Sequence, residues 1–333
     1  MVLEDAFRRP LLDLRISVTD RCNMRCRYCM PREHFDDNHE FLPKEDILRF
    51  EEIVRVVQAL LPHGLRKVRL TGGEPLLRRN LSELVRQLRA CSQELDIAIT
   101  TNGLLLSKHL DSLVDAGLSR ATISLDALDV NTYQLMGDTE ATPATVLKAI
   151  DEAQSIGLPL KINSVIKKDV NENQLVNLVR MFGPRGIPIR FIEYMDVGST
   201  NNWNLDQVVS ADSMREVLEQ EFGSLQVNQP QHASDVARVY STKDGWKIGF
   251  IESITNPFCG DCSRARLSAN GSIYTCLFAN KGHDVRGILR MDASDEDIAR
   301  AIQSIWVERK DRYSEERSIQ TKNLKVEMSY IGG

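Results

Sequence analysis

The chain alternates short apolar runs with longer segments in which apolar residues recur every three or four positions. The short runs are typical of buried strands, and the longer spacing is typical of helices that bury one face. Strands are predicted at 11–18, 67–70, 96–101, 120–125, 159–166 and 187–195. Helices are predicted between them at 44–61, after Asn80, from Ser107 to Gly117, from Thr142 to Gly157, and at 173–182. Asn80 and Ser107 are expected to cap two of these helices, with Glu83 completing a capping box.

Six strands joined by helices indicate parallel pairing through right-handed crossovers. Periodicity alone does not separate a doubly wound sheet from part of a (β/α) barrel. In both architectures ligands collect at the carboxyl ends of the strands. The polar segments that follow the predicted strands are therefore candidates for a site: the loop after the first strand, Gly72-Gly73-Glu74, Thr100-Thr101-Asn102, Ser124, Asn163 and Glu193–Met195.

The pattern changes near residue 200. The second part is predicted to contain a helix at 212–222, a polar linker at 226–234, antiparallel strands at 236–240 and 246–251, a hairpin of 264–267 and 272–276 around Asn270-Gly271, and a helix near 295–308. We therefore divide the chain into residues 1–200, which carry the strand–helix units, and residues 201–333.

The 333 residues include 42 Lys and Arg and 47 Asp and Glu, so the formal net charge is −5. This balance argues against a protein that coats nucleic acid, although it leaves room for a local basic pocket. No apolar run approaches the ~20 residues that span a bilayer, and the first residues lack a secretory pattern. We expect a cytoplasmic protein with no nucleic-acid and no membrane partner.

Six of the seven cysteines form two triplets. The first triplet consists of Cys22, Cys26 and Cys29, and the second triplet consists of Cys259, Cys262 and Cys276. Thiolates bind zinc and iron–sulfur clusters, and a [4Fe–4S] cluster with three cysteine ligands keeps one iron free for another molecule. The alternative is structural zinc, with His34 or His39 as fourth ligand at the first triplet and His283 at the second. The remaining Cys91 ends an apolar helix, where simple packing is expected.

Two segments resemble the radical S-adenosylmethionine (SAM) enzymes. They are the C-x3-C-x2-C loop, with an aromatic residue before its last cysteine, and Gly-Gly-Glu-Pro after the second strand. Within that superfamily the chain is similar to the GTP 3′,8-cyclase family of molybdenum cofactor biosynthesis. The matching segments are 19–31, 69–75, 190–195, 256–267 and Gly332-Gly333. The resemblance is weakest at 1–10, 224–240 and 290–325.

This resemblance implies an α/β fold, an incomplete (β/α)6 TIM-like barrel with a C-terminal α+β extension that carries a second Fe–S cluster. The implied cofactors are two [4Fe–4S] clusters, one at each triplet, and SAM. In the implied reaction, a SAM-derived 5′-deoxyadenosyl radical takes the ribose 3′-hydrogen of GTP. Carbon C3′ then attacks guanine C8, which gives (8S)-3′,8-cyclo-7,8-dihydroguanosine 5′-triphosphate, the first intermediate of molybdopterin cofactor biosynthesis.

The family's ligand contacts match particular residues of this chain. The SAM contacts match Tyr28, Gly73, Ser124 and Met195, and the GTP contacts match Arg15, Arg69, Thr100, Lys161 and Arg264-Ala265-Arg266, with Arg190 as a further candidate. Arginine forks suit phosphate oxygens, and an unpaired cation beside an apolar strand is costly without an anionic partner. The resemblance also implies catalytic roles for Arg264, Arg266, Gly332 and Gly333, the last two as a tail that enters the barrel.

Without the family, these residues have plainer interpretations. Tyr28 and Met195 suit barrel packing, Arg264 and Arg266 suit a solvated face, and Gly332-Gly333 suits a frayed end.

The expected partners are GTP, a reductant protein such as flavodoxin or ferredoxin, the next pathway enzyme, cyclic pyranopterin monophosphate synthase, and a second copy of the chain in a homodimer. One alternative is another two-cluster radical SAM enzyme, such as a peptide-modifying maturase, which lack of GTP binding would favour. Another is an electron carrier or a zinc-stabilised binding module. About eight irons without zinc would exclude the zinc module.

Overall fold

The computed structural model describes residues 2–230, 234–317 and 325–332. Its centre is a run of six parallel strands: β1 (Asp13–Ser17), β2 (Lys67–Thr71), β3 (Asp96–Thr101), β4 (Arg120–Ser124), β5 (Leu160–Ile166) and β6 (Ile189–Glu193). These strands pair in chain order from β1 to β6. A doubly wound sheet would reverse its order at a switch point, whereas sequential order is that of a barrel. The expected incomplete (β/α)6 barrel is therefore confirmed.

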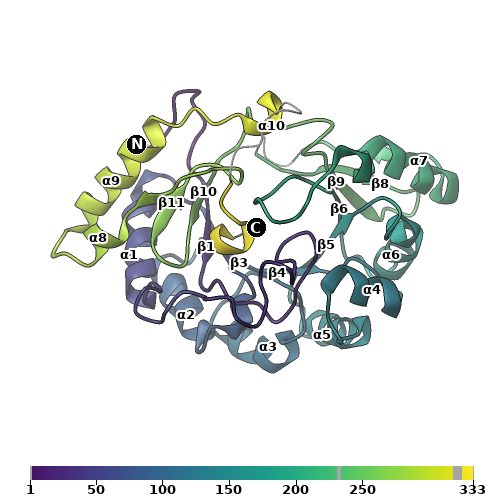
Figure 1. Ribbon diagram of the computed structural model, residues 1–333, viewed down its shortest axis with the longest axis horizontal. Helices are drawn as coiled ribbons and strands as arrows, with labels where there is room; N and C mark the ends of the chain where they lie inside the picture. The colour runs from purple at the N-terminus through teal and green to yellow at the C-terminus, as the bar shows by residue number, and fades with distance from the viewer. Residues whose placement is uncertain (1, 231–233, 318–324, 333) are drawn as a thin grey trace.

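Helices cover the outer face of these strands. They are α1 (Phe50–Leu60), α2 (Leu81–Cys91), α3 (Leu106–Asp115), α4 (Val130–Gly137), α5 (Pro143–Ser155) and α6 (Leu175–Phe182), and they form an arc around the sheet (Figure 1). The helices that the sequence predicts bury the apolar faces expected from their periodicity; α1, for example, buries Ile53, Val56, Val57 and Leu60. Short 3₁₀ turns lie at η1 (Leu61–His63), η2 (Pro75–Leu77), η3 (Glu172–Gln174) and η4 (Leu205–Gln207).

The C-terminal third of the chain adds strands to both edges of this sheet. On one edge, β9 (Lys247–Ile251) pairs parallel to β6, and β8 (Arg238–Ser241) and β7 (Gln226–Val227) follow it antiparallel. On the other edge, β10 (Arg264–Leu267) pairs parallel to β1, followed antiparallel by β11 (Ser272–Tyr274) and β12 (His283–Asp284). The described residues thus share one 12-stranded sheet.

Five further helices belong to this part of the chain: α7 (Ala211–Phe222), α8 (Arg286–Leu289), α9 (Asp295–Val307), α10 (Tyr313–Glu316) and α11 (Met328–Ile331). Helix α9 packs against α1 on the outside of the molecule. Helix α11 instead contacts β1, and the C-terminal end of the chain lies within the ring of strands (Figure 1).

Two capping predictions are wrong. Asn80 has a left-handed backbone (φ 57°), and its side chain caps no backbone amide of α2. The expected partner Glu83 binds Arg86 and Gln87 instead. Ser107 lies inside α3, which begins at Leu106.

The helix predicted at 44–61 begins only at residue 50. Helix α4 was not predicted, and the linker predicted at 226–234 contains β7 and overlaps undescribed residues 231–233.

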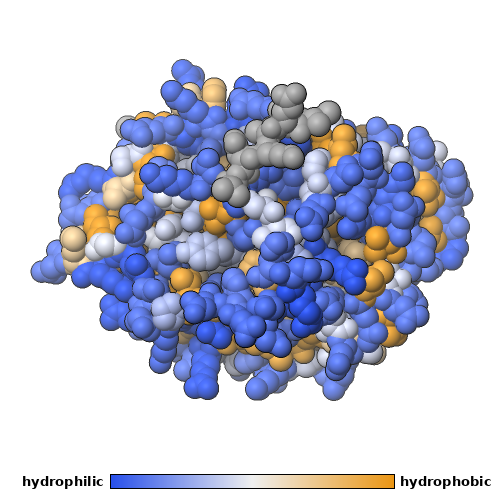
Figure 2. All heavy atoms as spheres, viewed as in Figure 1, coloured by the Kyte–Doolittle hydropathy of each residue, from blue (hydrophilic) through white to orange (hydrophobic). Residues whose placement is uncertain are grey.

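The face seen in Figure 2 is predominantly hydrophilic, with hydrophobic residues in small scattered groups. None of the helices in the described residues is both long and apolar enough to cross a lipid bilayer.

Candidate active site

Strand alternation directs charged side chains toward the inside of the barrel. In β1, Leu14 and Ile16 belong to the hydrophobic core beneath the helices, and Arg15 between them points the other way. Strand register then aligns Arg15 with Arg69 on β2 and with Arg266 on β10. Three neighbouring strands therefore present one row of guanidinium groups to the barrel interior.

Carboxylates among the described residues compensate these interior cations only in part: Asp13 favours the charged forms of Arg15 and Arg69, but burial outweighs it. Burial, with the charges of Arg266 and Arg69, lowers the pKa of Arg15 well below its usual value. Burial and neighbouring cations also lower the pKa of Arg190 to about 9 and that of Lys161 to about 8. The buried Nε atoms of Arg15 and Arg69 have no hydrogen-bond partner among the described residues. Because buried cations need compensation, this interior is built for a polyanion.

A single cavity lies at the carboxyl ends of the strands and extends into this interior. It contains about 1830 Å³ of space, counting the part that is open to solvent. Its walls include all six triplet cysteines and most residues predicted for SAM and GTP: Tyr28, Gly73, Ser124 and Met195, and Arg15, Arg69, Thr100, Arg264 and Arg266. Residues that lie more than 200 positions apart in the sequence thus face one space.

Three predicted contact residues do not line this cavity: Lys161, Arg190 and Ala265. Lys161 lies on β5, and among charged neighbours Arg190 does most to lower its pKa. The side chain of Ala265 is in the hydrophobic core, because Arg264 and Arg266 take the inward positions of β10. A contact from Ala265 to a ligand in the cavity is therefore limited to its backbone.

The first triplet lies in the loop after β1. The pKa of Cys26 is raised well above its usual value by burial and then by the neighbouring Cys22 and Cys29 thiols. Burial also raises the pKa of Cys22 to about 11. Three half-buried thiols whose ionisation is opposed by their surroundings favour a bound cation that would stabilise the thiolates, which fits a metal centre.

The described residues contain no group of three or more His, Cys, Asp or Glu side chains arranged to hold a metal ion. In a [4Fe–4S] cluster each cysteine binds a different iron, so the ligands are spread over the whole cluster.

The SAM residues lie beside this loop. A Cβ atom on Gly73 would come within 2.5 Å of the carbonyl carbon of Arg21, so the strand-to-loop turn has room only for glycine. The Tyr28 hydroxyl donates to Asp126 at 2.7 Å, and Asp126 also accepts from the Val165 amide at 2.8 Å. These contacts fix the ring of Tyr28 at the cavity wall and give a small molecule a preformed surface.

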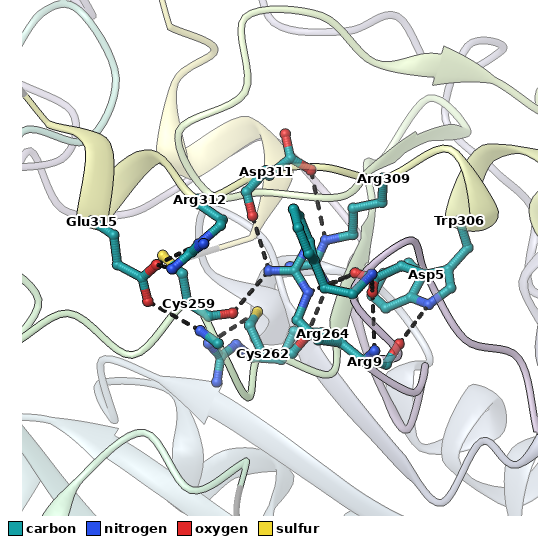
Figure 3. Close-up of polar contacts among 12 residues, drawn as sticks. Asp5, Arg9, Cys259, Cys262, Arg264, Trp306, Arg309, Asp311, Arg312 and Glu315 are labelled. Carbon is teal, nitrogen blue, oxygen red and sulfur yellow. Dashed lines mark hydrogen bonds and ion pairs between the residues drawn. The ribbon is translucent and has the colours of Figure 1, made fainter.

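The second triplet also lines this cavity. The Arg264 guanidinium donates to Cys262 Sγ at 3.2 Å (Figure 3). Burial opposes ionisation of Cys262, but the charges of Arg264 and Arg309 outweigh it and lower the thiol pKa to about 7. Burial raises the pKa of Cys276 to about 11. One cysteine of this triplet is thus prepared for ionisation by fixed positive charge.

The C-terminal tail, residues 325–332, enters the same region. The carbonyl of Gly332 accepts a hydrogen bond from Arg266, and Ser329 lines the cavity. Gly332 has a φ of 76°, and a Cβ atom there would overlap the Thr71 hydroxyl. A glycine is therefore required at this position. Gly333 lies outside the described residues.

Sequence reasoning missed several polar residues of the site. Asp126 follows Ser124 by two positions, so alternation at the end of β4 could have indicated it. Asp196 binds Lys325 at 2.6 Å and Arg317 at 2.9 Å, and thereby anchors the tail. No local pattern connects residues so far apart in the sequence.

Comparison with known proteins agrees with the class that this fold and site define. A partial (β/α)6 barrel with C-x3-C-x2-C in its first loop is the arrangement of radical SAM enzymes, and residues 16–182 match the radical SAM superfamily. Residues 187–315 match the molybdenum cofactor synthesis C family. A Staphylococcus epidermidis protein named GTP 3′,8-cyclase is 45% identical, over 100% of this chain and 99% of its own. Its Staphylococcus saprophyticus namesake is also 45% identical, over 99% of each chain. The chain belongs to the GTP 3′,8-cyclase family.

Solved structures confirm the fold. Streptococcus suis SuiB, bound to S-adenosylmethionine, aligns with a TM-score of 0.64 and 17% identity over 95% of this chain and 70% of its own. Methylornithine synthase aligns with a TM-score of 0.51 and 18% identity over 65% of this chain and 63% of its own. At these identities the likeness shows the barrel architecture and nothing further.

Proposed function

We propose that this protein is a GTP 3′,8-cyclase that uses SAM and [4Fe–4S] clusters to convert GTP into (8S)-3′,8-cyclo-7,8-dihydroguanosine 5′-triphosphate for molybdenum cofactor synthesis. The observation that carries the proposal is the row of inward arginines at one end of a cavity whose walls hold both cysteine triplets. This combination favours a polyanionic substrate over the alternative of a peptide-modifying enzyme.

At the first triplet, Cys22, Cys26 and Cys29 would hold a [4Fe–4S] cluster with one open iron. The cluster and SAM, when bound, supply the one-electron cleavage that generates the radical which takes the ribose 3′-hydrogen of GTP. Gly73 leaves room for SAM close to the backbone, and Asp126 orients Tyr28 against it. Ser124 and Met195 complete this part of the wall.

The triphosphate of GTP would lie against the inward cations. Arg15, Arg69 and Arg266 offer guanidinium forks, and Thr100 adds a buried hydroxyl that has no partner among the described residues. Each phosphate oxygen bound there offsets a burial cost that the folded protein already carries. Lys161 and Arg190 do not line the cavity and would attract the triphosphate through their charge alone.

At the second triplet, Cys259, Cys262 and Cys276 would hold a second [4Fe–4S] cluster that binds the guanine ring. Arg264 contacts Cys262 of the second triplet, and the neighbouring inward residue Arg266 contacts Gly332 of the tail. We assign both arginines and Gly332-Gly333 to the arrangement that orients the nucleotide and excludes water from the reacting atoms.

The assignment of parts follows from this arrangement. Residues 1–200 would generate the radical and would also contribute Arg15, Arg69 and Thr100 to the triphosphate site. Residues 201–333 would hold the second cluster and complete the nucleotide site with Arg264, Arg266 and the tail. We further propose a cytoplasmic homodimer that receives electrons from flavodoxin or ferredoxin and passes its product to cyclic pyranopterin monophosphate synthase.

Three cysteine variants test the proposal in anaerobic assays with GTP, SAM and dithionite. Cys29→Ala should abolish formation of 5′-deoxyadenosine. Cys276→Ala should block conversion of GTP while SAM cleavage continues. Cys91→Ala is the matched control, because Cys91 donates to the Gln87 carbonyl at 3.2 Å and lies outside the cavity.

Mass analysis of the nucleotide product and chromatography of 5′-deoxyadenosine provide the readouts. A Cys29→Ala protein that still cleaves SAM would refute the assignment of the first triplet. A wild-type protein that cleaves SAM but leaves GTP unchanged would refute the cyclase function itself.

A further inference from the structure

A buried network of charged residues surrounds the loop of the second triplet (Figure 3). It joins three distant parts of the chain: Asp5 and Arg9 before β1, the Cys259–Cys262 loop, and Arg309 after α9. The side chains of Asp5, Arg9 and Arg309 are 2% exposed or less. Two arginines buried this deeply are unusual and call for anionic or carbonyl partners. Two carboxylates supply part of the charge: Asp5, and Asp311, whose Oδ2 lies 3.6 Å from Arg309 Nε.

Both arginines bind the backbone of the cysteines themselves. Arg9 Nη1 donates to the Cys259 carbonyl at 2.8 Å, and Arg309 Nη1 donates to the Cys262 carbonyl at 2.7 Å. Arg9 Nη1 also donates to the Asp311 carbonyl at 2.9 Å. The two carbonyls belong to an irregular loop between β9 and β10, so no strand partner holds them.

The arginines are themselves held in place. Asp5 binds Arg9 Nε at 2.6 Å and Arg309 Nη1 at 3.3 Å, so one carboxylate links the two guanidinium groups. The Arg309 guanidinium also lies 4.5 Å from the centre of the Trp306 ring, whose Nε1 donates to the Arg9 carbonyl at 3.1 Å. These contacts fix the guanidinium groups before any metal is present.

We propose that Arg9 and Arg309 are positioning residues for the second triplet, an inference that rests on the proposed second cluster. A hydrogen bond to the carbonyl of a cysteine restricts the backbone from which its side chain projects, and χ1 then selects among the staggered positions of the sulfur. The two arginines therefore help to define where Cys259 Sγ and Cys262 Sγ can lie. They also place positive charge beside thiolates that carry net negative charge once ionised, which favours cluster binding.

The test uses reconstituted full-length protein and reads out iron, not catalysis. Arg309→Met removes one guanidinium and leaves the Asp5–Arg9 ion pair intact, and Arg9→Met leaves Asp5 paired with Arg309. Arg309→Lys keeps a buried charge but loses the planar guanidinium, which lies over the Trp306 ring and whose Nη1 contacts both Asp5 and the Cys262 carbonyl. The matched control is Arg89→Met, since Arg89 also binds backbone carbonyls, those of Gly117 and Leu95, far from either triplet.

Wild-type protein should hold about eight irons per chain, and chelator should remove them in two steps. The second site is the cluster whose electron paramagnetic resonance signal changes with GTP, and the first is the one whose signal changes with SAM. In all three variants, iron binding at the second site should weaken by about 10–100-fold, measured as the chelator concentration that removes half of that iron. The SAM-responsive cluster and the Arg89→Met control should behave as wild type.

The outcomes separate the two proposals. Unchanged chelator midpoints and an unchanged GTP-responsive signal in Arg309→Met and Arg309→Lys would overturn the positioning role. Equal loss of iron from both clusters would overturn it too, because the effect would then be general unfolding. A wild-type protein with only about four irons, all SAM-responsive, would instead refute the second cluster itself.

Discussion

Replacing Arg190 with methionine should make the ligand-free protein more stable, although it removes a hydrogen bond. Arg190 lies on β6, where its Nε donates to Asn163 at 2.9 Å and its buried Nη2 has no partner among the described residues. Burial, followed by the charges of Arg69 and Arg120, lowers its pKa to about 9. Methionine keeps most of the side-chain volume and removes the charge.

The magnitude follows from that pKa. A fall of this size from the usual arginine value corresponds to a cost of about 5 kcal/mol for keeping the charge at neutral pH. The hydrogen bond to Asn163 recovers about 1.5–3 kcal/mol, as bonds to charged groups do. The free energy of unfolding of Arg190→Met should therefore exceed that of wild type by about 2–3 kcal/mol at pH 7.

The pH dependence has a definite sign. Below pH 9 both the folded and the unfolded states hold the proton of Arg190, so the cost is constant. Above pH 9 the folded state releases this proton first, so the contribution of Arg190 to stability improves with rising pH. Arg190→Met should lack this improvement.

Urea unfolding of the reduced, ligand-free protein at about pH 7 and about pH 10 measures both effects. The control is Arg120→Met, because Arg120 binds Asp96 through three hydrogen bonds of 3.0, 3.2 and 2.7 Å. Breaking that pair should destabilise the protein by about 1–3 kcal/mol. An Arg190→Met protein that is no more stable than wild type at pH 7 would refute the conclusion that the barrel interior stores uncompensated positive charge.

Three further changes test other parts of the site. Gly73→Ala should abolish SAM binding in equilibrium dialysis, because its Cβ meets the backbone of Arg21 within 2.5 Å; wild-type affinity would contradict that packing. Asp196→Asn should weaken the contact to Lys325, so limited proteolysis should cleave the tail faster than in wild type; equal cleavage rates would show that Asp196 does not anchor it. Burial raises the pKa of Glu74 to about 7, so the free energy of unfolding should fall as pH rises toward and through that value. Glu74→Gln should flatten this pH dependence in urea unfolding. An unchanged slope of stability against pH would exclude Glu74 as the cause of the fall.

The strands could be predicted from sequence because each one carries its own evidence. In β5, Leu160, Ile162 and Ile166 face the core and Asn163 faces the cavity, so the alternation is visible in seven residues. Periodicity alone could not separate a barrel from a doubly wound sheet, because strand order leaves no trace in it; the family resemblance made that choice, and the strand order confirms it. The pairing of β9 with β6 and of β10 with β1 was equally hidden, because it joins segments far apart in the chain.

Some residues of the candidate site could be predicted from the sequence, and others could not. The cysteines and the inward arginines could be selected from spacing, strand position and family resemblance, and their gathering in one cavity supports that selection; their contacts with ligands stay predictions. Arg9 and Arg309 could not be selected, because only tertiary structure brings residues 300 positions apart onto one loop. The Asn80 cap failed for a local reason, since a left-handed backbone turns the side chain away from the helix amides.

The position of β1 between β2 and β10 has a consequence for how the protein is made. Synthesis adds about 5–20 residues per second, so the first cysteine loop leaves the ribosome well before residues 264–267. Until those residues emerge, one side of β1 remains an open edge that can pair with another nascent chain. The Arg309 contact to the second cysteine loop forms later still. The contacts that enclose the two cysteine loops are therefore completed at different times during translation.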